Sequence, residues 1–211
     1  MPVLEGKMFV TSKQIHASGS DLQDRAEFVW RDSNLVLIVA DGAGGTGGGA
    51  EAAEYVVRGV KNRIHTTELS PEALNGLLVS IDREMSALAC FGETTCALAV
   101  LSDRGVVGTS AGDSGSLVFS KAGVDNLTAS QIRKPLLGSG RAIPIGFTRN
   151  HFDGTLLMAS DGLLKYTSQE KIAATVLTAD LDAAANKLVD LVSYPSGALP
   201  DDVSVLLARK T

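Results

Sequence analysis

The sequence predicts an α+β fold in which pairs of helices cover stacked, mostly antiparallel sheets. Short apolar stretches separated by tight turns predict β-hairpins, and hairpins build antiparallel sheets. The predicted helices come in two consecutive pairs, whereas a parallel α/β fold would alternate them with strands. The chain has 211 residues, 45% of them hydrophobic, which is enough to bury a sizeable core. Because no stretch has the composition of a linker, we expect a single domain over residues 1–211.

Composition excludes several classes of protein. The net charge of −5 and the pI near 5.2 argue against a nucleic-acid-binding protein. No apolar run approaches the length of a membrane span, and the first ten residues lack the core of a signal peptide. We therefore expect a cytoplasmic protein without a membrane partner. Cys90 and Cys96 are too few for a disulfide framework, and Cys96 is expected to be a buried, inert thiol.

The first half of the chain predicts three strands and two helices. The strands are expected at residues 8–16, 26–31 and 35–40, the last two joined as a hairpin by the turn at 32–34. Residues 50–60 have helical spacing. Ser70 can cap a second helix, Pro71 suits its first position, and the helix should run to about residue 89. Its buried stripe is expected to consist of Leu74, Leu77, Leu78, Ile81, Met85 and Leu88.

The second half predicts five more strands and another helix pair. Strands at 94–101 and 106–110 should form a hairpin with a four-residue turn, and a strand at 116–120 follows the turn at 112–115. Residues 121–149 contain two prolines and four glycines and look irregular. They could form a mobile flap over a site or an ordinary surface connection. The remaining elements are a strand at 155–160, helices at 168–178 and 181–192, and a strand at 203–208.

Two of the apolar strands end in the same dipeptide, Asp-Gly. LVLIVADG ends at Asp41 and Gly42, and TLLMASDG ends at Asp161 and Gly162. A carboxylate on a tight turn after a buried strand is held rigidly by the core behind it, which suits a metal ligand. Three more aspartates stand at strand ends or in turns, namely Asp24, Asp113 and Asp201. Each alone is an ordinary turn or capping residue, but five such residues can converge at one edge of stacked sheets.

An all-carboxylate cluster favours Mg²⁺ or Mn²⁺, with several water ligands retained. Zinc is disfavoured, because the three histidines are scattered and the cysteines lack ligand spacing. A pair of divalent ions can lower the pKa of a water between them and clamp the oxygens of a phosphoester. Such a site needs no protein nucleophile, and the sequence has neither a Cys-x₅-Arg motif nor a Gly-x-Ser-x-Gly motif.

The succession of motifs resembles the metal-dependent serine/threonine phosphatases of the PP2C (PPM) family. The matching stretches are Gln23-Asp24, VADGAGG at 39–45, GETTCALAVL at 92–101, AGDSG at 111–115, LLMASDGL at 156–163 and DDVSVLL at 201–207. Each is weak alone, but together they span essentially the whole chain. The resemblance implies a four-layer α/β/β/α sandwich with a binuclear Mg²⁺ or Mn²⁺ centre at one edge. It also implies hydrolysis of phosphoserine and phosphothreonine.

The resemblance assigns a role to each matching position. Asp41 would bridge both metals, and the carbonyl of Gly42 would bind one of them. Asp161 and Asp201 would complete the protein ligands of the first metal. Asp24 lies at the first acidic motif, near the second metal. The catalytic residues implied in this way are Asp24, Asp41, Asp161 and Asp201.

Features of bacterial short members are also implied. Asp113 matches an aspartate that helps to bind a third, weaker metal, and the modest chain length is consistent with a reduced flap. The expected partner is a phosphorylated protein substrate. At the level of the family, a cognate Ser/Thr kinase or an anti-sigma-factor antagonist is a further expected partner.

Four positions depart from the family pattern. Gln23 replaces the usual Glu, Gly19 stands where the phosphate-binding Arg is usual, and Ala43 replaces a His found in some members. Asp202 replaces an Asn, which is closer to the sporulation and stress-response branch of SpoIIE, RsbU and RsbX. The candidates to replace the missing Arg are Lys13, His16 and Arg25.

Two other functions are alternatives to the phosphatase hypothesis. Residues 42–47 satisfy Gly-x-Gly-x-x-Gly after a strand and before a helix, as in a dinucleotide-binding domain. However, no acidic strand end follows about 20 residues later, and Asp41 would repel a pyrophosphate. The missing Arg and Glu instead favour a catalytically weak regulatory module that binds phosphoproteins. Substitution of Asp41 or Asp161 discriminates, because only a catalyst would lose its metal and its rate.

Overall fold

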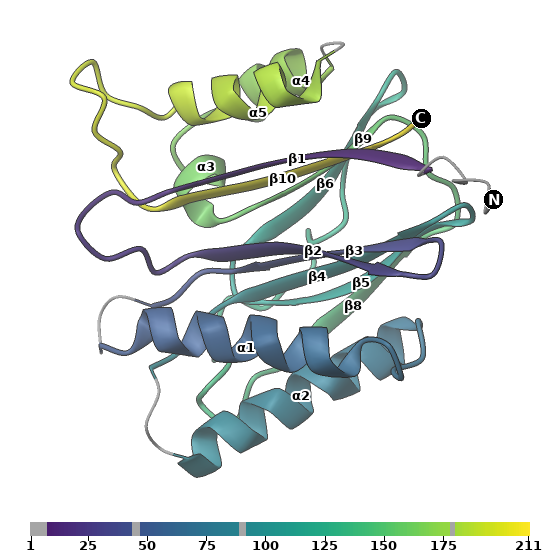
Figure 1. Cartoon of the computed structure of the whole chain (residues 1–211), viewed down its shortest axis with the longest axis vertical. Coiled ribbons are helices and arrows are strands. Elements are labelled where there is room, and N and C mark those ends of the chain that lie inside the picture. Colours follow the sequence, from purple (N-terminus) through teal and green to yellow (C-terminus); the bar gives the residue numbers. More distant parts are fainter. Residues whose placement is uncertain (1–7, 44–46, 89–91, 178–179) are drawn as a thin grey trace, which may run out of the picture.

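The computed structural model describes residues 8–43, 47–88, 92–177 and 180–211. Two five-stranded sheets are stacked face to face, and helices cover the outer face of each (Figure 1). The strand orders are β1-β10-β9-β6-β7 and β2-β3-β4-β5-β8. Within each sheet, every pair of neighbouring strands is antiparallel. The predicted α+β sandwich is confirmed. The described part of the chain has no parallel strand–helix–strand unit, so a dinucleotide-binding fold is excluded.

The strands of the first sheet are β1 (Phe9–His16), β10 (Val203–Lys210), β9 (Thr155–Ala159), β6 (Gly115–Ser120) and β7 (Gly123–Asn126). Those of the second sheet are β2 (Arg25–Arg31), β3 (Asn34–Ala40), β4 (Cys96–Ser102), β5 (Gly105–Ala111) and β8 (Ile145–Arg149). Helices α1 (Gly49–Arg63) and α2 (Pro71–Leu88) cover the second sheet. Helices α4 (Gln169–Val176) and α5 (Leu181–Asp190) cover the first, and a short α3 (Asp161–Leu164) follows β9.

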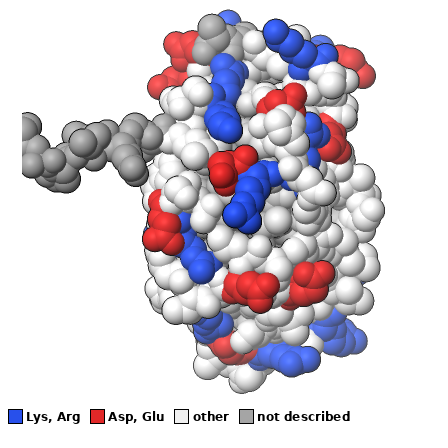
Figure 2. Space-filling view, turned by 90° about the vertical axis from the view of Figure 1, so that its right-hand side faces the viewer, with Lys and Arg blue, Asp and Glu red and all other residues white. Residues whose placement is uncertain are grey.

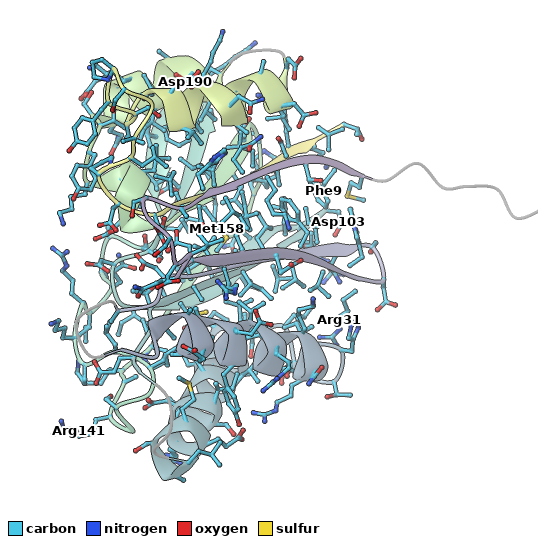
Figure 3. All side chains as sticks on the ribbon, turned by 60° about the vertical axis from the view of Figure 1, so that its left-hand side comes forward. Phe9, Arg31, Asp103, Arg141, Met158 and Asp190 are labelled. Atoms are coloured by element: carbon cyan, nitrogen blue, oxygen red, sulfur yellow. The ribbon has the colours of Figure 1, made fainter. Side chains whose placement is uncertain are left out.

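The strand β3 shows why its sequence is a continuous apolar run. Leu35 and Leu37 pack into the core between the two sheets, whereas Val36 and Ile38 pack against α1 and α2. Because side chains alternate along a strand, a strand covered on both faces needs apolar residues at every position. The core between the sheets also contains Phe9 from β1 and Met158 from β9 (Figure 3). A third core lies between the first sheet and α4 and α5.

Several local predictions need correction. The turn between β4 and β5 contains two residues, Asp103 and Arg104, rather than four. The short helix α3 was not expected. Leu88 does not belong to the buried stripe of α2, because it is 53% exposed where the helix ends away from the sheet (Figure 1). Cys96 is buried as predicted, and burial raises the pKa of its thiol to about 12. Cys90 lies outside the described residues.

The segment 121–149 contains two strands that the sequence did not predict. β7 and β8 are edge strands with polar or half-exposed residues, so they lack an alternating apolar pattern. The loop between them is fastened to α2 by the buried carboxylate of Asp82. This carboxylate accepts the backbone N–H groups of Gly138, Gly140 and Ala142 at 2.7–2.9 Å. The loop at 138–142 is therefore held against a helix, as expected of a structural connection.

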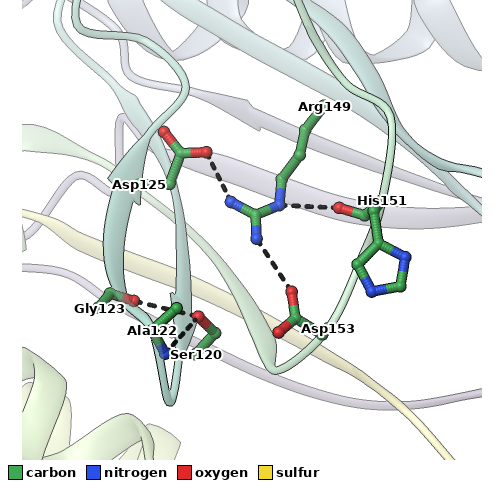
Figure 4. Close-up of polar contacts among 7 residues, drawn as sticks. All are labelled: Ser120, Ala122, Gly123, Asp125, Arg149, His151 and Asp153. Carbon is green, nitrogen blue, oxygen red and sulfur yellow. Dashed lines mark hydrogen bonds and ion pairs between the residues drawn. The ribbon is translucent and has the colours of Figure 1, made fainter.

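Arg149 links the edge strands of the two sheets (Figure 4). It stands at the end of β8 and donates hydrogen bonds to Asp125 of β7 at 2.6 Å and to Asp153 at 2.9 Å. Its Nε also donates to the carbonyl of His151 at 2.8 Å. On the face that Figure 2 shows, acidic and basic side chains are interspersed rather than sorted into one large patch. None of the helices in the described residues is long and apolar enough to cross a membrane.

Candidate metal centre

Antiparallel pairing brings the five predicted aspartates to one edge of the sandwich. Asp24 precedes β2 and Asp41 follows β3, and these strands pair so that Arg25 lies opposite Ala40. Asp113 stands between β5 and β6, Asp161 follows β9 and Asp201 precedes β10. In an antiparallel pair, the end of one strand lies beside the start of the next. The charges of the other four carboxylates all act on Asp41, so the structure brings these five residues together.

The backbone of Asp41 is held by the start of β4. Its N–H donates to Thr95 Oγ1 at 3.0 Å, and its carbonyl accepts from Thr94 Oγ1 and from the N–H of Thr95. The next residue must be glycine, because a Cβ on Gly42 would lie 2.3 Å from the carbonyl oxygen of Gly49. The Asp-Gly turn is therefore rigid, and its conformation follows from the close approach of α1.

The pKa of Asp41 is raised to about 9. Burial is the largest cause, followed by the negative charges of the neighbouring carboxylates, which are Asp24, Asp161, Asp201 and Asp113. No cation is among the causes of the shift. Buried carboxylates without positive partners are unfavourable unless they are protonated or bind a metal ion. The geometry around Asp41 thus favours a divalent cation.

Asp24 is fully buried, and among the described residues neither of its carboxylate oxygens has a hydrogen-bond partner. Burial raises its pKa to about 6, and the nearby hydroxyls of Ser160 and Ser204 lower it in part. The side-chain oxygen of Gln23 is also buried without a partner. Buried polar atoms are rarely left unpaired in proteins, and a bound ion with its waters is one common reason for an exception.

Asp161 and Asp113 differ from Asp41 in having cations nearby. The pKa of Asp161 is raised mainly by burial and then by Asp113 and Asp201, while Lys165 and Arg133 act in the opposite direction. Arg133 donates two hydrogen bonds to a single carboxylate oxygen of Asp113, from Nε at 3.1 Å and from Nη2 at 2.5 Å. Sequence analysis did not identify Arg133 or Lys165. The position of Lys165 four residues after Asp161 could have suggested it.

The adjacent residues Asp201 and Asp202 have different environments. Asp202 is buried, and its carboxylate accepts the N–H of Ser18 at 2.7 Å, the hydroxyl of Ser18 at 2.9 Å and the N–H of Gln23 at 2.6 Å. It therefore fastens the loop before β2 to the start of β10. Asp201 is more exposed, and both residues line a small hollow of about 300 Å³ together with Gly19, Asp41 and Gly42.

The three candidates to replace the missing arginine are engaged elsewhere. Lys13 forms an ion pair with Glu27 at 3.7 Å, and Arg25 bonds to Glu54 at 2.9 Å. His16 lies 3.0 Å from the side-chain oxygen of Gln14. None of the three lines the small hollow. A larger cavity of about 470 Å³ has Asp113, Asp161, Arg133 and Lys165 among its lining residues.

The residues present fit divalent cations, because the donors are oxygens only and several of them are buried without partners. Within the described ranges, no group of three or more His, Cys, Asp or Glu side chains is already arranged to hold a metal ion. All carboxylates of the cluster could be ionised together only with the divalent cations bound, because the positive charge of the cations offsets the repulsion at Asp41.

Comparisons with known proteins identify the family and the fold. The family model described as protein phosphatase 2C matches residues 13–134, which is more than half of the chain. An arginine-to-alanine variant of a bacterial serine phosphatase superposes with a TM-score of 0.87 at 21% identity, covering 98% of this chain and 100% of the other. The serine/threonine phosphatase Stp1 from Staphylococcus aureus gives 0.83 at 20% identity, covering 98% and 96%.

The catalytic domain of the serine/threonine phosphatase PstP, solved with two manganese ions, gives a TM-score of 0.80 at 19% identity. The match covers 95% of this chain and 97% of that one. Comparison with curated protein sequences finds no significant match. At these identities the solved structures establish the fold, and the family model establishes the relationship. The chain belongs to the protein phosphatase 2C family.

Proposed function

We propose that the protein is a metal-dependent phosphatase that hydrolyses phosphoserine and phosphothreonine in proteins. The observation that carries this proposal is the convergence of four acidic residues on Asp41, since burial and then their negative charges raise the pKa of Asp41 to about 9. Metal-ion catalysis of phosphoester hydrolysis needs such a cluster, because two divalent ions supply both an acidified water and a clamp for the phosphate oxygens. Membership of the protein phosphatase 2C family supports the same reaction.

Each acidic residue has a proposed task. Asp41 would bridge two Mg²⁺ or Mn²⁺ ions, and Asp161, Asp201 and the carbonyl of Gly42 would hold the first of them. Asp24 would contribute its two unpartnered oxygens beside the second ion. Metal binding would displace the proton that Asp41 holds in the metal-free protein, because a ligating carboxylate must be ionised. The two manganese ions of PstP support the proposed number of ions.

A third, weaker ion would use Asp113, which Arg133 holds in the metal-free structure. We further infer that residues 1–211 act as one domain and that the substrate is a phosphorylated protein. A cognate kinase or an anti-sigma-factor antagonist as partner stays a prediction. Cytoplasmic location and kinship with the SpoIIE, RsbU and RsbX branch also stay predictions.

A regulatory module without catalysis is the second candidate. It is favoured by one observation: in the part of the chain that the structure describes, no cation lines the small hollow beside Asp41. Such a module would bind phosphoproteins through other contacts and would not need two ions at the acidic edge.

Hydrolysis of p-nitrophenyl phosphate by the purified protein separates the two. We expect turnover with Mg²⁺ or Mn²⁺, none after chelation, and a loss of at least about a hundredfold in Asp41→Asn and Asp161→Asn. Asp103→Asn is the matched control, because Asp103 lies in the hairpin turn at the opposite edge (Figure 3). Calorimetric titration with Mn²⁺ accompanies the assay. Absence of both turnover and Mn²⁺ binding would leave the regulatory module as the better account.

A further inference from the structure

The larger cavity extends from the acidic edge to helix α4. Its volume is about 470 Å³. Asp113 and Asp161 of the proposed metal centre line it together with Arg133 and Lys165, and Leu117 and Ile172 are among its apolar lining residues. Leu117 comes from β6 and Ile172 from α4, and both are almost fully buried. The cavity therefore combines a charged end with an apolar wall, as ligand-binding cavities commonly do.

Two polar atoms in this cavity lack partners. The side-chain oxygen of Gln131 and the hydroxyl of Thr167 are inaccessible to solvent, and neither makes a hydrogen bond to the described residues. Both residues line the cavity. Gln131 lies before β8, and Thr167 follows α3. An amide oxygen accepts and a hydroxyl also donates, so the wall of the cavity holds both kinds of hydrogen-bonding group just beneath its surface.

The charge at the cavity mouth favours a phosphorylated ligand. The side chain of Arg133 is 71% exposed, and Lys165 is exposed as well. A phosphorylated residue carries a charge of about −1.5 to −2 at neutral pH. These two cations stand beside Asp113 and Asp161, where ions bound to the carboxylates would leave the mouth net positive. A phosphate approaching the metal centre would thus be drawn past the cavity mouth.

We propose that this cavity binds the segment of the phosphoprotein that flanks the phosphorylated residue and accepts one of its apolar side chains. The inference rests on the proposed function, since it assumes that the phosphate is delivered to the acidic edge. In an extended segment, side chains two residues apart point to the same face and lie about 7 Å apart. An apolar residue two positions from the phosphorylated one would then enter the cavity while the phosphate faces Asp161.

The test is a binding measurement that does not depend on turnover. The probe is a fluorescent nonapeptide with a non-hydrolysable phosphonate analogue of phosphoserine at its centre and leucine two positions to either side. Its partner has glycine at both of those positions. Fluorescence anisotropy with Mn²⁺ present is expected to show about tenfold tighter binding of the leucine peptide, as burial of part of one leucine would give.

Two tryptophan substitutions in α4 test whether the preference for the leucine peptide arises in the cavity. Gln169→Trp places a large ring in the cavity wall, and it should remove the preference for the leucine peptide. Ala174→Trp is the matched control, because Ala174 is exposed on the same helix and does not line the cavity. This variant should keep the tenfold preference. Circular dichroism and the Tm of both variants establish that each is folded before binding is compared.

The outcomes separate this inference from the proposed function. Equal binding of the two peptides by the wild type would overturn the cavity proposal, even if p-nitrophenyl phosphate is hydrolysed normally. Loss of the preference in both tryptophan variants, or in neither, would overturn it too. A leucine preference that only Gln169→Trp removes supports the proposal. If the same protein shows no metal-dependent turnover, the cavity serves a binding module and only the proposed phosphatase activity fails.

Discussion

Asp41 makes the stability of the metal-free protein depend on pH. Its pKa is about 9 in the folded chain and 3.8 in the unfolded one, so the folded state binds more protons between these values. Stability rises with pH only where the unfolded state binds more protons, and here the sign is reversed. The contribution of Asp41 to the free energy of unfolding is therefore greatest below pH 4 and falls as the pH rises toward 9.

Asp41→Asn should stabilise the metal-free protein at pH 7, because asparagine has no charge to neutralise. We expect an increase on the order of 2 kcal/mol, or about 4–8 °C in Tm. With excess Mn²⁺ the order should reverse, since only the wild type gains stability from the bound ions. Thermal unfolding in EDTA and in Mn²⁺ measures both effects. A lower Tm of the variant in EDTA would contradict this account of the cluster.

The neighbours Asp201 and Asp202 should respond differently to the same substitution. The carboxylate of Asp202 accepts the N–H and the hydroxyl of Ser18 and the N–H of Gln23. Asp202→Asn replaces one of its acceptor oxygens and should cost about 1.5–3 kcal/mol of stability. Asp201→Asn should change stability by less than about 0.5 kcal/mol while weakening Mn²⁺ binding. Urea unfolding and calorimetry together test the pair. Equal costs in stability would show that the two carboxylates share one role.

At the scale of elements, Asp82 fastens the loop at 138–142 to α2. Its carboxylate is 1% exposed and accepts three backbone N–H groups. Asp82→Asn replaces one acceptor by a donor and should cost about 2–3 kcal/mol. Hydrogen exchange at Gly138 and Gly140 should be slow in the wild type and fast in the variant. Glu72→Gln, at an exposed position on the same helix, is the control, and fast exchange in the wild type would count against a fixed loop.

The contacts of Arg149 join the edge strands β7 and β8. Because its two carboxylate partners are about half exposed, each ion pair contributes little, and the carbonyl of His151 adds a third contact. We expect Arg149→Ala to lower the free energy of unfolding by about 1 kcal/mol. The decrease should be smaller at high salt, because salt screens the ion pairs with Asp125 and Asp153. Arg104→Ala, in the exposed turn between β4 and β5, should be neutral. Chemical denaturation of both variants provides the comparison.

At the scale of the whole molecule, the core between the sheets makes both sheets depend on each other. Trp30, the only tryptophan, packs at this core from β2, so its fluorescence reports on one sheet while far-UV circular dichroism reports on all elements. A single domain predicts coincident urea transitions by the two probes. Leu37→Ala should shift both midpoints equally and cost about 2–5 kcal/mol. Separate transitions would contradict the single domain.

The sequence alone was sufficient for the layers and for the acidic edge. The apolar run of β3 and the apolar stripe of α2 have periods set by strand and helix geometry, so they can be read without the fold. The positions of Asp41 and Asp161 follow from the ends of two such strands. The edge strands β7 and β8 escaped prediction, because half-exposed strands lack the pattern of a buried face.

Only the tertiary structure decided which neighbouring side chains face the site. Asp201 and Asp202 are equivalent in the sequence, but Asp202 turns inward to Ser18, which is 184 positions away. Arg25 stands next to Asp24, yet Glu54 of α1 draws its guanidinium away, whereas Arg133 reaches Asp113 from a loop with no motif. Local periodicity determines where strands and turns form. Contacts between distant segments depend on how the layers pack, and no local pattern contains that information.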